Sequence, residues 1–207
     1  MKSSLIFLAV LLGTTTIGYF ATNYLENEVF PLPVYSEENH VIEDFELTNQ
    51  KGEKFISKEH ENKIWVVNYF FTICPTVCPQ MMRNVQSVHN IVRNENDILL
   101  LSFTVDPQRD TAGRLMEYTE RFNINHDNWQ LLTGEKQDLY RLARQSFLVS
   151  ATEGNGDDTD FIHSENIVII DKDRKIRGMV NGTAPNAAQQ VLDIISRLKK
   201  LGVRSDA

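Results

Sequence analysis

The sequence has little positive charge, because 21 Lys and Arg residues stand against 28 Asp and Glu residues and give a formal net charge of −7. It also has no long basic run. Proteins that bind the phosphate backbone of nucleic acids carry clustered Lys and Arg. We therefore expect no nucleic acid among the partners of this chain.

Cysteine is equally scarce, with two residues in 207. A structural zinc site normally takes four protein ligands, and no further cysteine is present to complete one. Cys74 and Cys78 are four residues apart in the segment Phe71-Thr72-Ile73-Cys74-Pro75-Thr76-Val77-Cys78-Pro79. Two thiols at this spacing suit a redox pair, a soft-metal site or a structural disulfide, and the spacing does not choose among the three.

Charged residues are absent from the stretch 3–25, which begins with an apolar run from Leu5 to Leu12. As a helix rising about 1.5 Å per residue, this stretch would extend about 34 Å, enough for a bilayer core of about 30 Å. We expect residues 1–25 to form one transmembrane anchor. A cleaved signal peptide is the alternative, although small residues at an Ala-x-Ala-like cleavage site are hard to place.

The cellular location follows from the charges that flank this stretch. Lys2 is the only basic residue beside it, which favours a cytoplasmic N-terminus and a domain on the far side of the membrane. No Arg-rich, acid-poor transit segment is present. We expect a single-pass protein of the bacterial cell membrane with its domain facing the periplasm or the outside, and a mitochondrial inner membrane is less favoured.

Residues 26–40 are polar and contain Pro31 and Pro33, which predicts a linker before one domain at 41–207. The runs 64–71 and 98–105 are continuously apolar, which is typical of strands buried on both faces. The segment between them is predicted to be a helix over 79–93, because apolar residues recur there at helical spacing: Met81, Val85, Val88 and Val92.

The remaining patterns complete an α/β fold. A hairpin is expected from 41–47 and 54–57, and an antiparallel pair from 167–170 and 175–180. Further helices are expected over 111–122, 136–147 and 186–201. The order of these elements predicts a thioredoxin-like domain, with a central mixed sheet flanked by helices.

The cysteine pair is expected close to the start of the helix that follows the first buried strand. A helix N-terminus lowers the pKa of a thiol and favours the thiolate that binds metal or attacks disulfides. His163, in Asp160-Phe161-Ile162-His163-Ser164, is the candidate third ligand. Two thiolates and an imidazole suit trigonal Cu(I), and with an added oxygen donor they suit Cu(II).

Asp106 and Arg109 follow the second buried strand, at the sheet edge where the first strand delivers its cysteines. They could orient the ligands of a metal or form a structural ion pair. Asp110 or Thr111 is expected to cap the next helix.

The chain resembles the Sco/SenC family, thioredoxin-fold copper chaperones for the assembly of cytochrome c oxidase. The resemblance spans 64–171 and is carried by four motifs in the family's order. These are the Phe71–Pro79 segment, Thr104-Val105-Asp106-Pro107-Gln108-Arg109-Asp110-Thr111, Leu131-Leu132-Thr133-Gly134, and Phe161-Ile162-His163-Ser164 followed by Ile169-Ile170-Asp171. Thr76 and Gln108 depart from the residues common at these positions, while the candidate ligands are intact.

The resemblance implies that Cys74, Cys78 and His163 bind copper. It implies delivery of that copper, received from a copper donor protein, to the dinuclear copper site of cytochrome c oxidase subunit II or to another cuproprotein. It also allows the protein to reduce the cysteines of that site. A metallochaperone of this kind is not an enzyme in its main role.

Two other classes of function stay open at this point. The first is a thiol-disulfide oxidoreductase of the cell envelope, in which Cys74 attacks and Cys78 resolves the mixed disulfide. The second is a copper- or redox-sensing module that uses the same residues.

Overall fold

A computed structural model describes residues 2–24, 32–35, 39–124, 128–149 and 162–205. The chain divides into two compact units, Met1–Pro33 and Val34–Ala207. The division falls inside the predicted linker 26–40, of which 26–31 and 36–38 lie outside the described residues. The domain boundaries themselves stay a prediction.

The first unit contains the helix α1, Lys2–Tyr24. The side chains described on it, 11–22, are all exposed. Three consecutive threonines, Thr14–Thr16, interrupt its apolar side chains, and their hydroxyls donate to carbonyls of the preceding turn. Within the described ranges no helix is long and apolar enough to cross a membrane. The predicted transmembrane segment is thus present as a helix, and its role as a membrane span is not shown.

The second unit is built on one mixed sheet of seven strands in the order β2-β1-β5-β4-β3-β6-β7. The central strands β3, β4 and β5 are parallel, and the other neighbours are antiparallel. The strands are β1 Glu46–Asn49, β2 Lys54–Ile56, β3 Ile64–Phe70, β4 Ile98–Thr104, β5 Trp129–Thr133, β6 Asn166–Ile170 and β7 Ile176–Asn181. The two predicted antiparallel pairs are confirmed as β1–β2 and β6–β7, although β1 begins at Glu46 and not at the predicted Val41.

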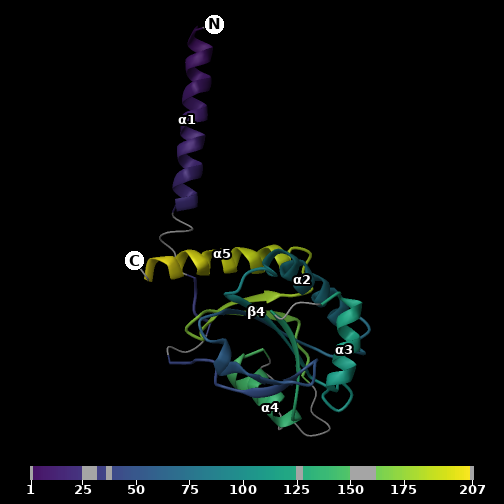
Figure 1. Cartoon of the computed structure of the whole chain (residues 1–207). Helices are drawn as coiled ribbons and strands as arrows, with labels where there is room; N and C mark the ends of the chain where they lie inside the picture. The colour runs from purple at the N-terminus through teal and green to yellow at the C-terminus, as the bar shows by residue number, and fades with distance from the viewer. Residues whose placement is uncertain (1, 25–31, 36–38, 125–127, 150–161, 206–207) are drawn as a thin grey trace. The chain divides into compact units, whose positions relative to one another are not determined.

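Helices cover both faces of the sheet, with α2, α3 and α5 on one face and α4 on the other (Figure 1). They are α2 Val77–Val92, α3 Ala112–Arg121, α4 Lys136–Arg141 and α5 Ala187–Ser205, with a short 3-10 helix, η2, at Ser57–His60. The helix predicted over 136–147 changes form at its middle, because α4 continues as a π-helical turn, η3, at Leu142–Ser146. The predicted layered α/β architecture is confirmed.

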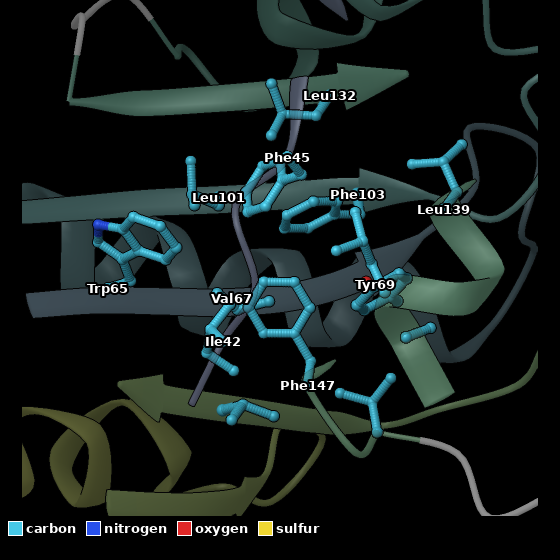
Figure 2. Packing of buried hydrophobic residues seen from close by; sticks show 14 of the residues in the cluster. Ile42, Phe45, Trp65, Val67, Tyr69, Leu101, Phe103, Leu132, Leu139 and Phe147 are labelled. Atoms are coloured by element: carbon cyan, nitrogen blue, oxygen red, sulfur yellow. The ribbon is translucent and has the colours of Figure 1, made fainter. Parts of the chain in front are cut away.

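The strand that leads to the cysteines, β3, and its neighbour β4 are buried along their whole length. Every residue of β3 and β4 is buried, because helices cover both faces of these strands. Alternate side chains point to opposite faces. One set enters the cluster of Figure 2, where Trp65, Val67 and Tyr69 of β3 lie beside Leu101 and Phe103 of β4. The end of β3 is therefore rigidly held.

The helix α2 packs as its spacing predicts, since the apolar residues that repeat along it are buried: Met81, Val85, Val88 and Val92. It begins at Val77, two residues before the predicted start at Pro79. This difference matters for the site, because it brings Cys78 into the first turn of α2.

Candidate metal centre

The two cysteines lie where β3 passes into α2. Cys74 is in the turn between these elements, and Cys78 is the second residue of α2. Both are reduced and buried, with 6% and 4% of their surface exposed. The backbone N–H of Cys78 donates to Sγ of Cys74 over 3.4 Å. Cys74 thus lies in front of the helix N-terminus, and Cys78 lies within the first helical turn.

The surroundings make the two thiols unequal. Burial alone would raise the pKa of Cys74, but hydrogen bonds from the Cys78 thiol and from the N–H groups of Cys78, Thr76 and Val77 outweigh it and lower that pKa. Burial, followed by the hydrogen bond to Cys74, raises the pKa of Cys78 to about 12. Cys74 is therefore the thiol that ionises first, and Cys78 holds the proton that the pair shares.

A cavity of about 370 Å³ opens beside this pair. Its wall is contributed by four segments: the end of β3, the start of α2, Val105 after β4, and residues 162–165 before β6. Cys78 and His163 both line it. A larger cavity of about 540 Å³ lies away from the cysteines, between the β1–β2 hairpin and α4, and none of its lining residues belongs to the candidate site.

His163 reaches this cavity because it lies just before β6, which pairs with β3. In this antiparallel pairing Asn68 lies opposite Ile167, so the start of β6 adjoins the end of β3. Residues 162–165, which precede β6, therefore enter the cavity wall together with the end of β3 and the start of α2.

The three candidate ligands do not form a closed cluster. Among the residues that the structure describes, no group of three or more His, Cys, Asp or Glu side chains is arranged to hold a metal ion. The structure brings Cys74 and Cys78 together and places the exposed His163 on the wall of the same cavity. The three-residue ligand set stays a prediction, and it requires the side chain of His163 to approach the cysteines.

Asp110 is a residue of this region whose role the sequence analysis missed. Its side chain is completely buried, and Oδ2 accepts hydrogen bonds from the Thr72 backbone N–H over 3.1 Å and from the Thr104 hydroxyl over 2.6 Å. Its Oδ1 accepts from the Thr72 hydroxyl over 2.5 Å. Asp110 thus ties the turn before Cys74 to the end of β4. Thr111 alone caps α3, through the N–H of Arg114.

Asp106 and Arg109 form an ion pair with each other, with 2.9 Å between Oδ2 and Nη1. The Arg109 side chain is 67% exposed. Backbone N–H groups of Arg109 and Asp110 donate to the Asp106 carbonyl, so the pair sits in a tight turn after β4. Neither residue belongs to the described wall of the cavity. Their predicted role in orienting metal ligands stays a prediction.

Comparisons with known proteins agree with this geometry. The SCO1/SenC family model matches residues 33–200. The SCO1 protein homolog of Bacillus subtilis is 29% identical over 163 residues, which cover 78% of this chain and 82% of that protein.

Solved structures share the fold. A SCO1/SenC family lipoprotein from Bacillus anthracis superposes with a TM-score of 0.68 at 29% identity, over 81% of this chain and 99% of that one. BsSco is described as a member of the Sco family of cytochrome c oxidase assembly proteins with a disulfide switch. It superposes with a TM-score of 0.65 at 26% identity, over 79% of this chain and 96% of that one. Bradyrhizobium japonicum ScoI, solved with copper bound, superposes with a TM-score of 0.60 at 22% identity, over 76% of this chain and 99% of that one. At this identity the similarity supports a shared fold and no more.

The family model covers most of the chain, and it includes the cysteine turn, the buried Asp110 and the histidine segment of the cavity wall. The thioredoxin-like fold predicted from the order of the elements is also the fold of these solved relatives. The chain belongs to the SCO1/SenC family.

Proposed function

We propose that this protein is a copper metallochaperone that binds copper through Cys74, Cys78 and His163 and delivers it to the dinuclear copper site of cytochrome c oxidase subunit II. The observation that carries the proposal is the pair of reduced, adjacent thiols beside a cavity that His163 also lines. Membership of a family with a described cytochrome c oxidase assembly protein supports the choice of target.

The donor atoms support copper as the cargo. Thiolates select soft ions, and imidazole is compatible with both oxidation states of copper. Two sulfur atoms and one nitrogen suit three-coordinate Cu(I), which we propose as the form that is carried. Zinc is less suited, because structural zinc takes four protein ligands.

The unequal thiols suggest an order of events in loading. Cys74 offers the first thiolate, because hydrogen bonds already lower its pKa. Cys78 gives up its proton as the ion arrives, since metal ligands bind deprotonated. His163 joins last from the cavity wall and leaves first on transfer, because a neutral imidazole is easier to release than a thiolate.

The test is an anaerobic Cu(I) titration of the reduced protein against a competing chelator. One tight equivalent is expected for the wild type, and it should be lost in Cys74→Ala and Cys78→Ala and weakened in His163→Ala. His60→Ala is the matched control, because His60 stacks on Phe55 and neither residue lines this cavity. Wild-type affinity in His163→Ala would contradict the three-residue site.

A second candidate function is thiol-disulfide exchange, favoured by the same inequality of the thiols. Cys74, with its lowered pKa, would attack a partner disulfide, and Cys78 would then resolve the mixed disulfide. This function predicts reduction of a disulfide substrate without metal and with His163 replaced. Activity that needs neither copper nor His163 would favour it over delivery of copper.

We further propose that α1 attaches the domain to a bacterial cell membrane, with the domain on the periplasmic or outer side. The segment 3–24 has no charged side chain. The hydroxyls of Thr14–Thr16 and Thr22 bond to carbonyls of their own helix, so they would stay paired in the absence of water. Carbonate extraction of membranes is the test, and a protein released in full without removal of residues 1–25 would contradict the proposal.

A further inference from the structure

Tyr69, near the end of β3, carries a buried hydroxyl without a hydrogen-bond partner in the part of the chain that the structure describes. The residue is 2% exposed, and burial raises the pKa of its phenol well above the ordinary value, so the hydroxyl keeps its proton. A buried polar group without a partner is destabilising, and in native proteins it is rare enough to require a reason.

The ring of Tyr69 is held firmly. It stacks on Phe103 with 5.0 Å between the ring centroids and packs edge-on against Phe147 with 6.3 Å between the centroids. Figure 2 labels these three side chains in the hydrophobic cluster. Tyr140, in the same hydrophobic cluster, satisfies its hydroxyl by donating to the Val105 carbonyl over 2.7 Å. The packing around Tyr69 therefore fixes its hydroxyl in place, and a partner has to come to it.

The segment able to supply that partner is the cavity wall at 162–165. Tyr69 lines the same cavity as Cys78 and His163, and Ile162 belongs to the same hydrophobic cluster as Tyr69. Ile162 therefore anchors this wall in the cluster that holds Tyr69, and His163 is the next residue.

His163 is the side chain on this segment whose second ring nitrogen would need an acceptor once the first ring nitrogen binds a metal. A histidine that ligates a metal through one ring nitrogen carries a proton on the other, and this N–H is normally held by an acceptor that orients the ring.

We propose that Tyr69 is the positioning residue for His163, with its phenolic oxygen accepting the imidazole N–H when the histidine joins the two cysteines. This inference rests on the proposed copper function. The unpaired hydroxyl of the metal-free protein favours the approach of the His163 side chain, because the phenolic oxygen then accepts a hydrogen bond. Tyr69 itself does not touch the metal.

The size of the effect follows from the one hydrogen bond involved. A net gain typical of a neutral hydrogen bond corresponds to about a three- to tenfold change in copper affinity. Tyr69→Phe should weaken Cu(I) binding by about this factor. It should also leave the melting temperature of the metal-free protein unchanged or higher, because the substitution removes a buried polar group that has no partner.

The experiment is a double-mutant cycle on the full chain in mild detergent, reduced and anaerobic. Cu(I) affinity is measured by chelator competition for the wild type, Tyr69→Phe, His163→Ala and the double variant. We expect Tyr69→Phe to weaken binding in the wild type and to add nothing in the His163→Ala background. The electron paramagnetic resonance spectrum of the Cu(II) form should change in Tyr69→Phe, as the orientation of the histidine ring changes.

Tyr140→Phe is the control, because it removes a tyrosine hydroxyl that is already paired. It should lower the melting temperature, and any effect on copper affinity should be the same with and without His163. Wild-type affinity in Tyr69→Phe, or equal weakening in both backgrounds, refutes the role of Tyr69 while the copper function stands. Failure of the wild type to bind copper tightly refutes the proposed function itself.

Discussion

Replacing Asp110 by alanine should destabilise the protein more than any change to the exposed charges around it. Asp110 accepts three hydrogen bonds inside the protein, two from Thr72 and one from Thr104. Asp110→Ala leaves three buried donors unpaired, each costing about 1–3 kcal/mol. The substitution also removes the desolvation cost of the buried carboxylate and lets water reach some of the unpaired donors, and both effects offset part of this sum. We expect a net loss of about 3–5 kcal/mol, a large share of the 5–15 kcal/mol typical of a folded domain.

Urea unfolding of the reduced, metal-free protein at pH 7, followed by circular dichroism, measures this loss. Arg109→Ala is the matched control, because the Arg109 side chain is 67% exposed, although its partner Asp106 is buried, and an ion pair with one exposed member contributes about 1 kcal/mol. Asp110→Asn keeps the shape and one acceptor oxygen, so its loss should lie between those of the other two variants. An Asp110→Ala protein as stable as Arg109→Ala would refute the view that this carboxylate holds the turn before Cys74.

Other predictions concern the cysteines, a close backbone approach and a helix cap. Cys74 should react with iodoacetamide at neutral pH before Cys78, because its pKa is lowered and that of Cys78 is raised. Its labelling rate, followed by peptide mass spectrometry, should fall as the pH drops below its lowered pKa. Faster labelling of Cys78 would contradict this order. Gly182→Ala should cost about 1–3 kcal/mol, because an added Cβ would lie 2.8 Å from the Glu165 carbonyl oxygen, and an unchanged melting temperature would be inconsistent with this contact. Thr111→Ala should cost about 1 kcal/mol through loss of the α3 cap, measured by the same urea unfolding, and Thr111→Ser should recover most of it.

The strands and helices that the sequence predicted share a simple physical basis. The runs 64–71 and 98–105 are largely apolar because both faces of β3 and β4 are covered. The buried face of α2 is visible in the sequence because its apolar residues recur at helical spacing. β5 was missed, since a short segment with the polar Gln130 does not look like a core strand. Gln130 is tolerated because its side chain accepts a hydrogen bond from Asn49, which is far away in the sequence.

The site was predictable only in part, because its geometry depends on contacts between segments that are far apart in the sequence. The cysteine spacing and the family motifs indicated the pair, but the place of Cys74 ahead of the helix depends on where α2 begins. The place of His163 on the wall of the cavity that Cys78 lines depends on the pairing of β6 with β3. Asp110 and Tyr69 are recognisable only from what their polar atoms contact or lack, which a linear pattern does not contain.

The position of β3 in the sheet has a consequence for how the site forms as the chain folds. One neighbour, β4, follows β3 after a single helix, whereas the other, β6, comes much later in the sequence. Contacts that are local in sequence form at lower entropic cost than distant ones. We therefore expect β3, α2 and β4 to assemble first, with both thiols present before the histidine wall closes over them. A newly made chain would pass through a stage in which its cysteines are open to oxidants, and so would depend on a reductant before it could take up copper.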